Sequence, residues 1–108
     1  MITITIAYPN APGSWFDVEY YLRTHMPLSA RLLSAHPGFR SCTIERGLSG
    51  AEPGSPAPFA ALCHFVFDSI EEFVAAFTPH ASQLQGDMPN YTDIVPVIQV
   101  STVAFQHS

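Results

Sequence analysis

The chain has 108 residues and a formal net charge of −5, with nine acidic residues against four arginines and no lysine. This length predicts one domain, residues 1–108. The negative charge argues against nucleic acid and against an anionic membrane surface as partners, because both attract basic proteins.

Hydrophobic residues make up 47% of the chain and charged residues only 12%. The apolar share is enough to fill a core without metal or disulfide staples, and the small charged share leaves little polar surface to cover a monomer. The sequence shows no basic leader and no apolar run long enough to span a bilayer. We therefore expect a cytoplasmic protein whose apolar surface is partly covered by another subunit.

Every second residue from Ile2 to Tyr8 is large and apolar, and this period of two predicts a strand. A turn of Pro, Asn and Gly follows, and Ser14 is a suitable N-cap for a helix that we expect to run to His36. Pro27 lies inside this helix, where it removes a backbone donor and crowds the preceding turn. We expect a kink or a break there, close to His25.

Two further strands are predicted at about 39–47 and at 59–67, joined by a loop rich in Pro, Gly and Ser at 48–58. The second of these strands is nearly all apolar, which is typical of a strand covered on both faces. If the hairpin is centred on the loop, Cys42 and Cys63 lie opposite each other. Two cysteines are too few for a disulfide framework, so we expect a reduced pair.

Asp68 or Ser69 is expected to cap a second helix, and the spacing from Ser69 to Glu72 fits a capping box. This helix is expected to end at Pro79. The last strand is predicted from Val95 to Phe105. The buried stripe of the helix should comprise four apolar residues: Ile70, Phe73, Val74 and Phe77.

The predicted order of elements is strand, helix, strand, strand, helix, strand. This is the order of the ferredoxin-like βαββαβ fold, an α+β architecture whose antiparallel sheet carries helices on one face only. Because the strands are apolar on both faces, a second layer must cover the open face. The same face of another copy is the simplest cover, so we predict a homodimer.

Two stretches concentrate the side chains that could carry chemistry: Tyr20 to Leu28, and Gly86 to Gln99. The second stretch combines turn residues with carboxylates directly before a strand. Such loops on a firm scaffold commonly hold binding or catalytic groups. We expect the fold to bring the two stretches together around one apolar pocket.

Within these stretches three motifs occur in order: Tyr20-Tyr21 with His25-Met26-Pro27-Leu28, then Asp87-Met88-Pro89-Asn90-Tyr91-Thr92-Asp93, then Pro96-Val97-Ile98-Gln99. Together they resemble the EthD family over nearly the whole chain. That resemblance implies a dimeric α+β barrel, in which two ferredoxin-like subunits join their sheets. The family is named for a role in ether degradation beside an oxygenase system. Related barrels include muconolactone isomerases, polyketide cyclases and small cofactor-free monooxygenases, which share a pocket between sheet and helices and often use a histidine as acid or base.

His25 is the candidate catalytic residue. An unperturbed imidazole titrates near a pH of about 6.5, so it can exchange protons at cellular pH. The alternative is a structural histidine that only ties a helix end to the downstream loop by a hydrogen bond.

Five further residues are candidates for orienting His25 or for binding a polar group of the substrate: Tyr21, Asp87, Asn90, Tyr91 and Asp93. A carboxylate on one imidazole nitrogen fixes which nitrogen carries the proton. Tyr21 lies four residues before His25 on the same helix face and is preferred to Tyr20 for the pocket. The alternative is that Asp and Asn in this loop bond only local backbone and that the tyrosines only pack.

No metal and no tightly bound cofactor is expected. The histidines show no ligand spacing such as His-Glu-x-x-His, the glycines form no dinucleotide- or phosphate-binding fingerprint, and no serine sits in a nucleophile elbow. Cys63 and His64 are neighbours on a strand and point to opposite faces, so they cannot pair as nucleophile and base.

The favoured hypothesis is a homodimer that binds a small, mostly apolar organic molecule and performs cofactor-independent acid/base chemistry on it, such as isomerisation or cyclisation, with His25 as proton carrier. Oxygenase-type chemistry in a catabolic pathway is a variant of this hypothesis. The alternative is a non-catalytic ligand-binding or accessory protein of a degradation pathway. A third option is a structural dimer whose interior is filled by Phe and Val side chains, which predicts no cavity large enough for a ligand.

Overall fold

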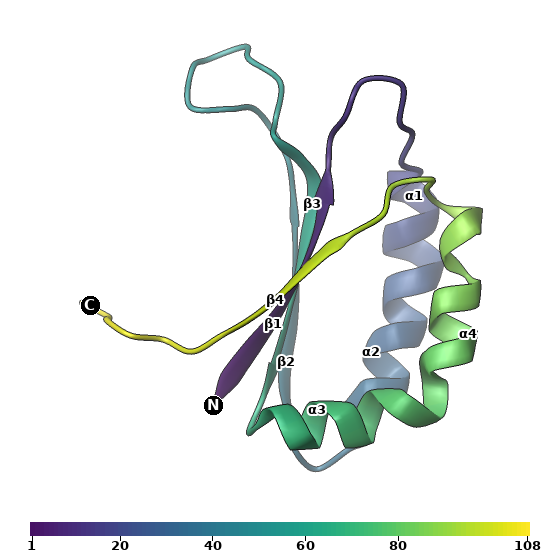
Figure 1. Ribbon diagram of the computed structural model, residues 1–108, viewed down its shortest axis with the longest axis vertical. Coiled ribbons are helices and arrows are strands. Elements are labelled where there is room, and N and C mark those ends of the chain that lie inside the picture. Colours follow the sequence, from purple (N-terminus) through teal and green to yellow (C-terminus); the bar gives the residue numbers. More distant parts are fainter.

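A layer of strands and a layer of helices make up the computed structural model, which describes residues 1–108 (Figure 1). In chain order the elements are β1 (Ile2–Pro9), α1 (Val18–Tyr20), α2 (Met26–Ser34), β2 (Phe39–Arg46), β3 (Phe59–Phe67), α3 (Ile70–Phe77), α4 (Ala81–Gly86) and β4 (Val97–Ser101). The strands form one antiparallel sheet in the order β2-β3-β1-β4. The α+β, ferredoxin-like βαββαβ fold predicted from the sequence is confirmed.

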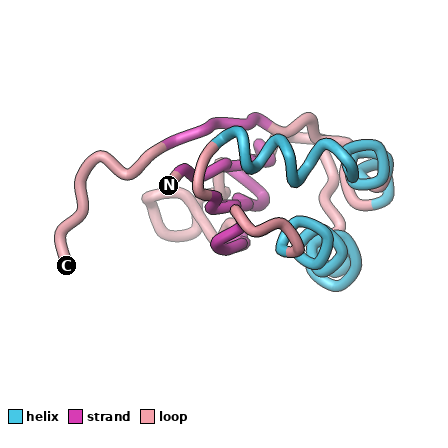
Figure 2. The backbone as a smooth tube through the Cα atoms, turned by 90° about the horizontal axis from the view of Figure 1, so that it is seen from below, coloured by secondary structure: helices cyan, strands magenta, loops and turns pink.

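One face of the sheet carries all the helices, and the segment after β4 leaves on the other side (Figure 2). Along β3, buried side chains alternate with half-buried ones, so that Cys63 and Phe65 face the helices while His64 and Val66 face away. The prediction that β3 is covered on both faces therefore does not hold within one chain. The face that carries His64 and Val66 is open.

The core lies between the sheet and the helices. β1 is central, with Ile6 opposite Cys63 of β3 on one side and opposite Ile98 of β4 on the other. Eleven buried residues form the core: Ile4, Tyr8, Tyr21, Met26, Leu33, Ala61, Cys63, Phe65, Phe67, Ala76 and Tyr91. No helix on this core has both the length and the apolar character needed to cross a membrane.

The first helix begins later than the sequence predicts. Its N-cap is Asp17 and not Ser14, since Asp17 Oδ1 accepts a hydrogen bond from the amide of Tyr20 at 3.1 Å. The hydroxyl of Ser14 instead donates to a carbonyl of the preceding turn at 2.5 Å. Phe16 lies before the helix, in an isolated bridge with Thr92. The chain ahead of α1 is therefore tied to the loop that follows α4.

A widened helical turn lies directly before Pro27, where a kink or a break was expected. Residues Tyr21–His25 form a π-helical turn, closed by the amide of Met26 donating to the carbonyl of Tyr21. α2 then starts with Pro27 in its first turn, where a missing amide costs little. A proline crowds the carbonyl four residues before it, and a wider turn relieves that crowding. The chain therefore stays helical through the proline.

The second helical segment is longer than predicted. The hydroxyl of Ser69 caps α3 as expected, accepting from the amide of Glu72 at 3.2 Å. α3 ends before Pro79, but a short 3-10 turn carries the chain through the proline into α4, which the sequence analysis missed. Ile70 and Val74 are exposed, so the predicted buried stripe is wrong at these positions. α3 rests on the core through its two phenylalanines, and its opposite side meets solvent.

Two strand predictions also need correction. β4 covers only Val97–Ser101, because only these residues pair with β1, whereas the sequence predicted a strand from Val95 to Phe105. Cys42 and Cys63 do not lie opposite each other, since Cys63 pairs with Ile44. The loop between β2 and β3 is not symmetrical about its centre, which shifts the register by two residues. The two thiols remain diagonal neighbours on the face that carries the helices.

Candidate functional site

The π-helical turn places two rings side by side on the buried face of the first helix. Tyr21 and His25 begin and end this turn, and only 1% and 7% of their surfaces are exposed. Their rings stack with centroids 5.8 Å apart and planes at 14°. Tyr21 rather than Tyr20 therefore faces the interior, next to the candidate proton carrier. Such π-turns frequently occur at functional sites.

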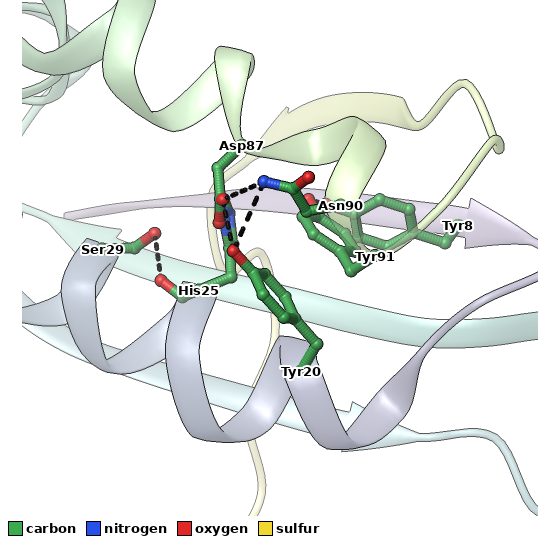
Figure 3. A network of polar contacts seen from close by, with 7 residues as sticks. All are labelled: Tyr8, Tyr20, His25, Ser29, Asp87, Asn90 and Tyr91. Atoms are coloured by element: carbon green, nitrogen blue, oxygen red, sulfur yellow. Dashed lines mark hydrogen bonds and ion pairs between the residues drawn. The ribbon is translucent and has the colours of Figure 1, made fainter.

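Asp87 lies opposite this turn, where α4 ends and a 3-10 turn, Met88–Asn90, begins. His25 Nδ1 lies 2.9 Å from Oδ2 of the carboxylate. The other oxygen, Oδ1, accepts from the Tyr20 hydroxyl at 2.6 Å and from the side-chain amide of Asn90 at 2.9 Å. Figure 3 shows these side chains converging from the first helix and from the chain that follows α4. The carboxylate thus joins the two stretches that the sequence analysis singled out.

The electrostatics of this cluster decide which His25 nitrogen carries the proton. Burial alone favours the neutral acid, but the hydrogen bonds from Tyr20, Asn90 and His25 outweigh it and hold the pKa of Asp87 below its usual value. Asp87 is therefore ionised at neutral pH and can only accept hydrogen bonds. Nδ1 of His25 must then carry a hydrogen, so in the neutral ring Nε2 is an unprotonated acceptor.

An apolar cavity of about 340 Å³ lies between the helices and the sheet and reaches His25. Fourteen of its 18 lining residues are hydrophobic. His25 Nε2 has no hydrogen-bond partner within the chain, and the ring forms part of the cavity wall. The volume falls within the range of small-molecule sites. The option of an interior filled completely by Phe and Val side chains therefore does not hold.

Three buried tyrosines form the wall beside His25. The Tyr91 ring lies 4.6 Å from the His25 ring and 5.0 Å from the Tyr21 ring, measured between centroids. The hydroxyls of Tyr8 and Tyr91 bond each other at 2.9 Å. Burial raises the pKa of Tyr8, Tyr21 and Tyr91 above the usual value for a phenol. All three side chains therefore keep their hydroxyl hydrogens at neutral pH.

The predicted site residues fall into two groups in the structure. Tyr21, His25 and Tyr91 line the cavity. Asp87 and Asn90 stand behind His25 in the polar cluster and do not line the cavity. A direct contact of these two side chains with substrate has no support in this geometry, whereas a role in orienting His25 does.

Asp93 belongs to neither group. Its Oδ1 accepts from the amide of Trp15 at 2.9 Å, and the Thr92 hydroxyl donates to the carbonyl of Trp15 at 2.8 Å. These contacts hold the loop after α4 against the segment before α1. Asp93 does not line the cavity. It bonds backbone, but the backbone of a distant segment and not the local backbone that was the alternative considered for it.

Tyr20 is a member of the polar cluster that the sequence analysis left out of the site. Adjacent residues on a helix point about 100° apart, so Tyr20 lies at the edge of the core, half-buried, when Tyr21 enters it. Its hydroxyl then meets Asp87 at the end of α4. The sequence offered only the Tyr20-Tyr21 pair as a signal, because it did not reveal α4.

The two cysteines are free thiols, and one of them reaches the cavity. A hydrogen bond from the Cys63 thiol lowers the pKa of Cys42, and the same bond together with burial raises the pKa of Cys63.

No group of three or more His, Cys, Asp or Glu side chains lies close enough to hold a metal ion.

The fold and this site define a class of protein, the ferredoxin-like α+β subunit of the type found in dimeric α+β barrels, with a ligand-sized cavity between helices and sheet. Residues 16–94, most of the chain, match the model of the EthD domain. The chain therefore belongs to the EthD domain family, and the resemblance noted in the sequence is confirmed.

Solved structures agree with this assignment. The chain is 40% identical to an EthD-like protein from Ralstonia eutropha JMP134, with a TM-score of 0.88 over 99% of this chain and 95% of that one. An EthD family protein from Bacillus halodurans C-125 is 18% identical, with a TM-score of 0.64 over 95% of this chain and 98% of that one. SnoaB from Streptomyces nogalater, a cofactor-independent oxygenase, is 17% identical, with a TM-score of 0.51 over 97% and 92%. The last two similarities bear on the fold alone. No curated protein matches the chain.

Proposed function

We propose that this protein binds a small, mostly apolar organic molecule in the cavity and that His25 exchanges a proton with it through Nε2. The observation that carries the proposal is the position of the imidazole. Its ring forms part of the cavity wall while Nδ1 lies 2.9 Å from an ionised carboxylate, which leaves Nε2 free on a ring that is 7% exposed.

The chemistry that follows is general acid–base catalysis. Nε2 accepts a proton from an acidic C–H or O–H group of the ligand, and the electron pair of the broken bond stays on the ligand as an enolate or phenolate. The imidazolium that forms is stabilised by the Asp87 carboxylate on its other nitrogen. Return of the proton to a different atom gives an isomer. Attack of the enolate carbon on a carbonyl of the same molecule gives a ring, and the alkoxide that forms takes the proton back from His25.

The oxygenase variant shares this first step. An electron-rich enolate or phenolate can react with dissolved oxygen, and SnoaB, which shares the fold, is named as a cofactor-independent oxygenase. Oxygen consumption with a bound ligand distinguishes it from isomerisation. A non-catalytic accessory protein predicts saturable binding without proton exchange and without oxygen uptake.

We also propose that two copies join through the open face of the sheet to form the homodimer expected from the sequence. Val66 and Val97 lie on this face, and 57% of Val97 is exposed in the single chain. Polar side chains on the same face already bond one another, since His64 Nδ1 lies 3.0 Å from Thr5 Oγ1 and Nε2 lies 2.8 Å from Glu45 Oε1. Paired groups of this kind can enter an interface without leaving unsatisfied donors or acceptors.

The proton-exchange proposal can be tested without knowledge of the natural substrate. β-Tetralone is a flat, neutral ketone whose methylene hydrogens are acidic, and their replacement by deuterium in D2O can be followed by proton NMR. We expect the protein to accelerate this exchange and His25→Ala to slow it by about a hundredfold or more. Arg31→Ala, on the exposed side of α2, is the matched control and should exchange at the native rate. Saturable binding of β-tetralone without accelerated exchange favours the accessory protein instead.

A further inference from the structure

No arginine or lysine lines the cavity to hold an anionic ligand. Its 18 lining residues include no Arg, Asp or Glu, and the lining groups outside the hydrophobic set are His25, Ser29, Gln85 and Pro96. The Asp87 carboxylate lies behind His25, 2.9 Å from Nδ1. A carboxylate or phosphate beside the neutral His25 ring would lose its hydration without gaining an ion pair. The site therefore favours a neutral ligand.

Aromatic rings line the cavity from two directions. Tyr21 and Tyr91 lie on the wall beside His25. Phe73 and Phe77 of α3 also line the cavity and stack on each other, with centroids 5.6 Å apart and planes at 12°. Aromatic side chains pack favourably face to face, offset, or edge to face with other aromatic rings. The wall therefore favours a flat aromatic ligand over a branched aliphatic one.

The polar end of the cavity accepts a hydrogen bond at one atom. His25 Nε2 is an unprotonated acceptor because Nδ1 carries the hydrogen that faces Asp87. The hydroxyls of Tyr8 and Tyr91 already bond each other, and these side chains are only 3% and 0% exposed. A ligand hydroxyl therefore satisfies the free acceptor by donating to Nε2.

We propose that the ligand of this cavity is a neutral hydroxylated aromatic compound, a phenol or the enol of an aryl ketone, whose hydroxyl donates to His25 Nε2. The proposal rests on the proposed function and specifies its substrate class. Ethers and hydrocarbons of the same shape fill the cavity without supplying the donor, and aromatic carboxylates meet no arginine or lysine there.

A matched series of four compounds tests this class: naphthol, methoxynaphthalene, naphthalene and naphthoate, each titrated calorimetrically into the native protein at neutral pH. We expect naphthol to bind about tenfold more tightly than its methyl ether, and naphthoate to bind more weakly than naphthalene. Equal binding of naphthol, ether and hydrocarbon overturns the donor proposal while leaving an apolar ligand site intact. Tightest binding of naphthoate also overturns it. No saturable binding of any of the four contradicts the proposed function itself.

Asp87→Asn provides a second test that does not depend on absolute affinity. Oδ1 of the carboxylate is held by two donors, Tyr20 and Asn90, so the amide oxygen of the variant takes that position and the amide NH2 faces His25 Nδ1. Nδ1 then becomes the acceptor and Nε2 carries the hydrogen. The preference for naphthol over methoxynaphthalene should shrink or reverse in this variant. An unchanged preference overturns the assignment of Nε2 as the acceptor.

Discussion

The His25 imidazole and the Asp87 carboxylate meet at 2.9 Å although the two residues are 62 positions apart in the chain. The sequence named Asp87 as one of five candidates for orienting His25 but did not single it out as the partner. The meeting depends on the π-helical turn that ends at His25 and on α4, which delivers Asp87. Together they place the imidazole so that Asp87 holds its Nδ1 hydrogen, while Nε2 has no partner in the chain and the ring forms part of the cavity wall.

The stability of the native protein is predicted to fall in acid through Asp87. The folded-state pKa of this carboxyl is lowered, so the unfolded chain takes up the proton at a higher pH than the folded chain does. The ionised Asp87 stabilises the folded protein fully at pH values above the pKa of this carboxyl in the unfolded chain. This stabilisation is lost as the pH falls from about 5 through the lowered pKa of the folded chain. Denaturant unfolding of the native protein and of Asp87→Asn across this range measures the difference. The plots of unfolding free energy against pH for these two proteins should converge in acid. The control is Glu52→Gln, in the exposed loop after β2, whose plot should stay parallel to that of the native protein.

Removing the Tyr20 hydroxyl is predicted to raise the pKa of Asp87 toward its usual value. Tyr20→Phe deletes the donor at 2.6 Å and keeps the ring. The Asn90 and His25 contacts remain, so Asp87 should stay ionised at neutral pH and His25 should keep its proton on Nδ1. Carboxyl carbon-13 NMR titration of Asp87 checks the shift. An unchanged titration curve would show that Tyr20 does not hold the carboxylate in solution.

The two cysteines are predicted to react at different rates with an alkylating reagent such as iodoacetamide. The pKa of Cys42 is lowered by the Cys63 thiol, and this side chain is half-buried, whereas burial and the same hydrogen bond raise the pKa of Cys63. Thiolate is the reactive form, so Cys42 should be modified first near neutral pH. Peptide mapping of the singly modified protein identifies the site. Modification of Cys63 first would contradict the contact between the two thiols.

The open face of the sheet is predicted to be the dimer interface. Val66→Asp places an unpaired charge on this face, on the inner strand β3, and should convert a dimer into a monomer, as measured by light scattering during gel filtration. Val74→Asp is the control, because Val74 is 53% exposed on α3 and lies in the helical layer. A native protein that is monomeric at micromolar concentration, or a Val66→Asp variant that stays dimeric, is incompatible with this interface.

The strands were predictable from the sequence, and the second helical segment was not. Alternation from Ile2 to Tyr8 and the apolar run at 59–67 gave β1 and β3 nearly residue for residue. Pro79 predicts the end of the second helix, yet a 3-10 turn accommodates this proline. An amide at the start of a helical turn has no partner within the helix, so a proline there costs no hydrogen bond. α4 was missed for this reason, although it is what places Asp87.

Residue types in the site were easier to predict than their partners. His25 and Asp87 were both recognised as candidates because of their chemistry, and Tyr21 was chosen for the pocket from its helical spacing to His25. Tyr20 and Asp93 show the limit of that reasoning. The contacts of Tyr20 with Asp87 and of Asp93 with Trp15 join segments far apart in the chain, and no local pattern specifies such a pairing.

The central claim is that Asp87 holds the His25 hydrogen on Nδ1 and leaves Nε2 free in the cavity. Long-range proton–nitrogen NMR on nitrogen-15-labelled protein measures this directly when the ring is neutral, because protonated and unprotonated ring nitrogens have well-separated shifts. The account predicts a protonated Nδ1 and an unprotonated Nε2 in the native protein, exchanged in Asp87→Asn. A native His25 with its hydrogen on Nε2 would contradict it.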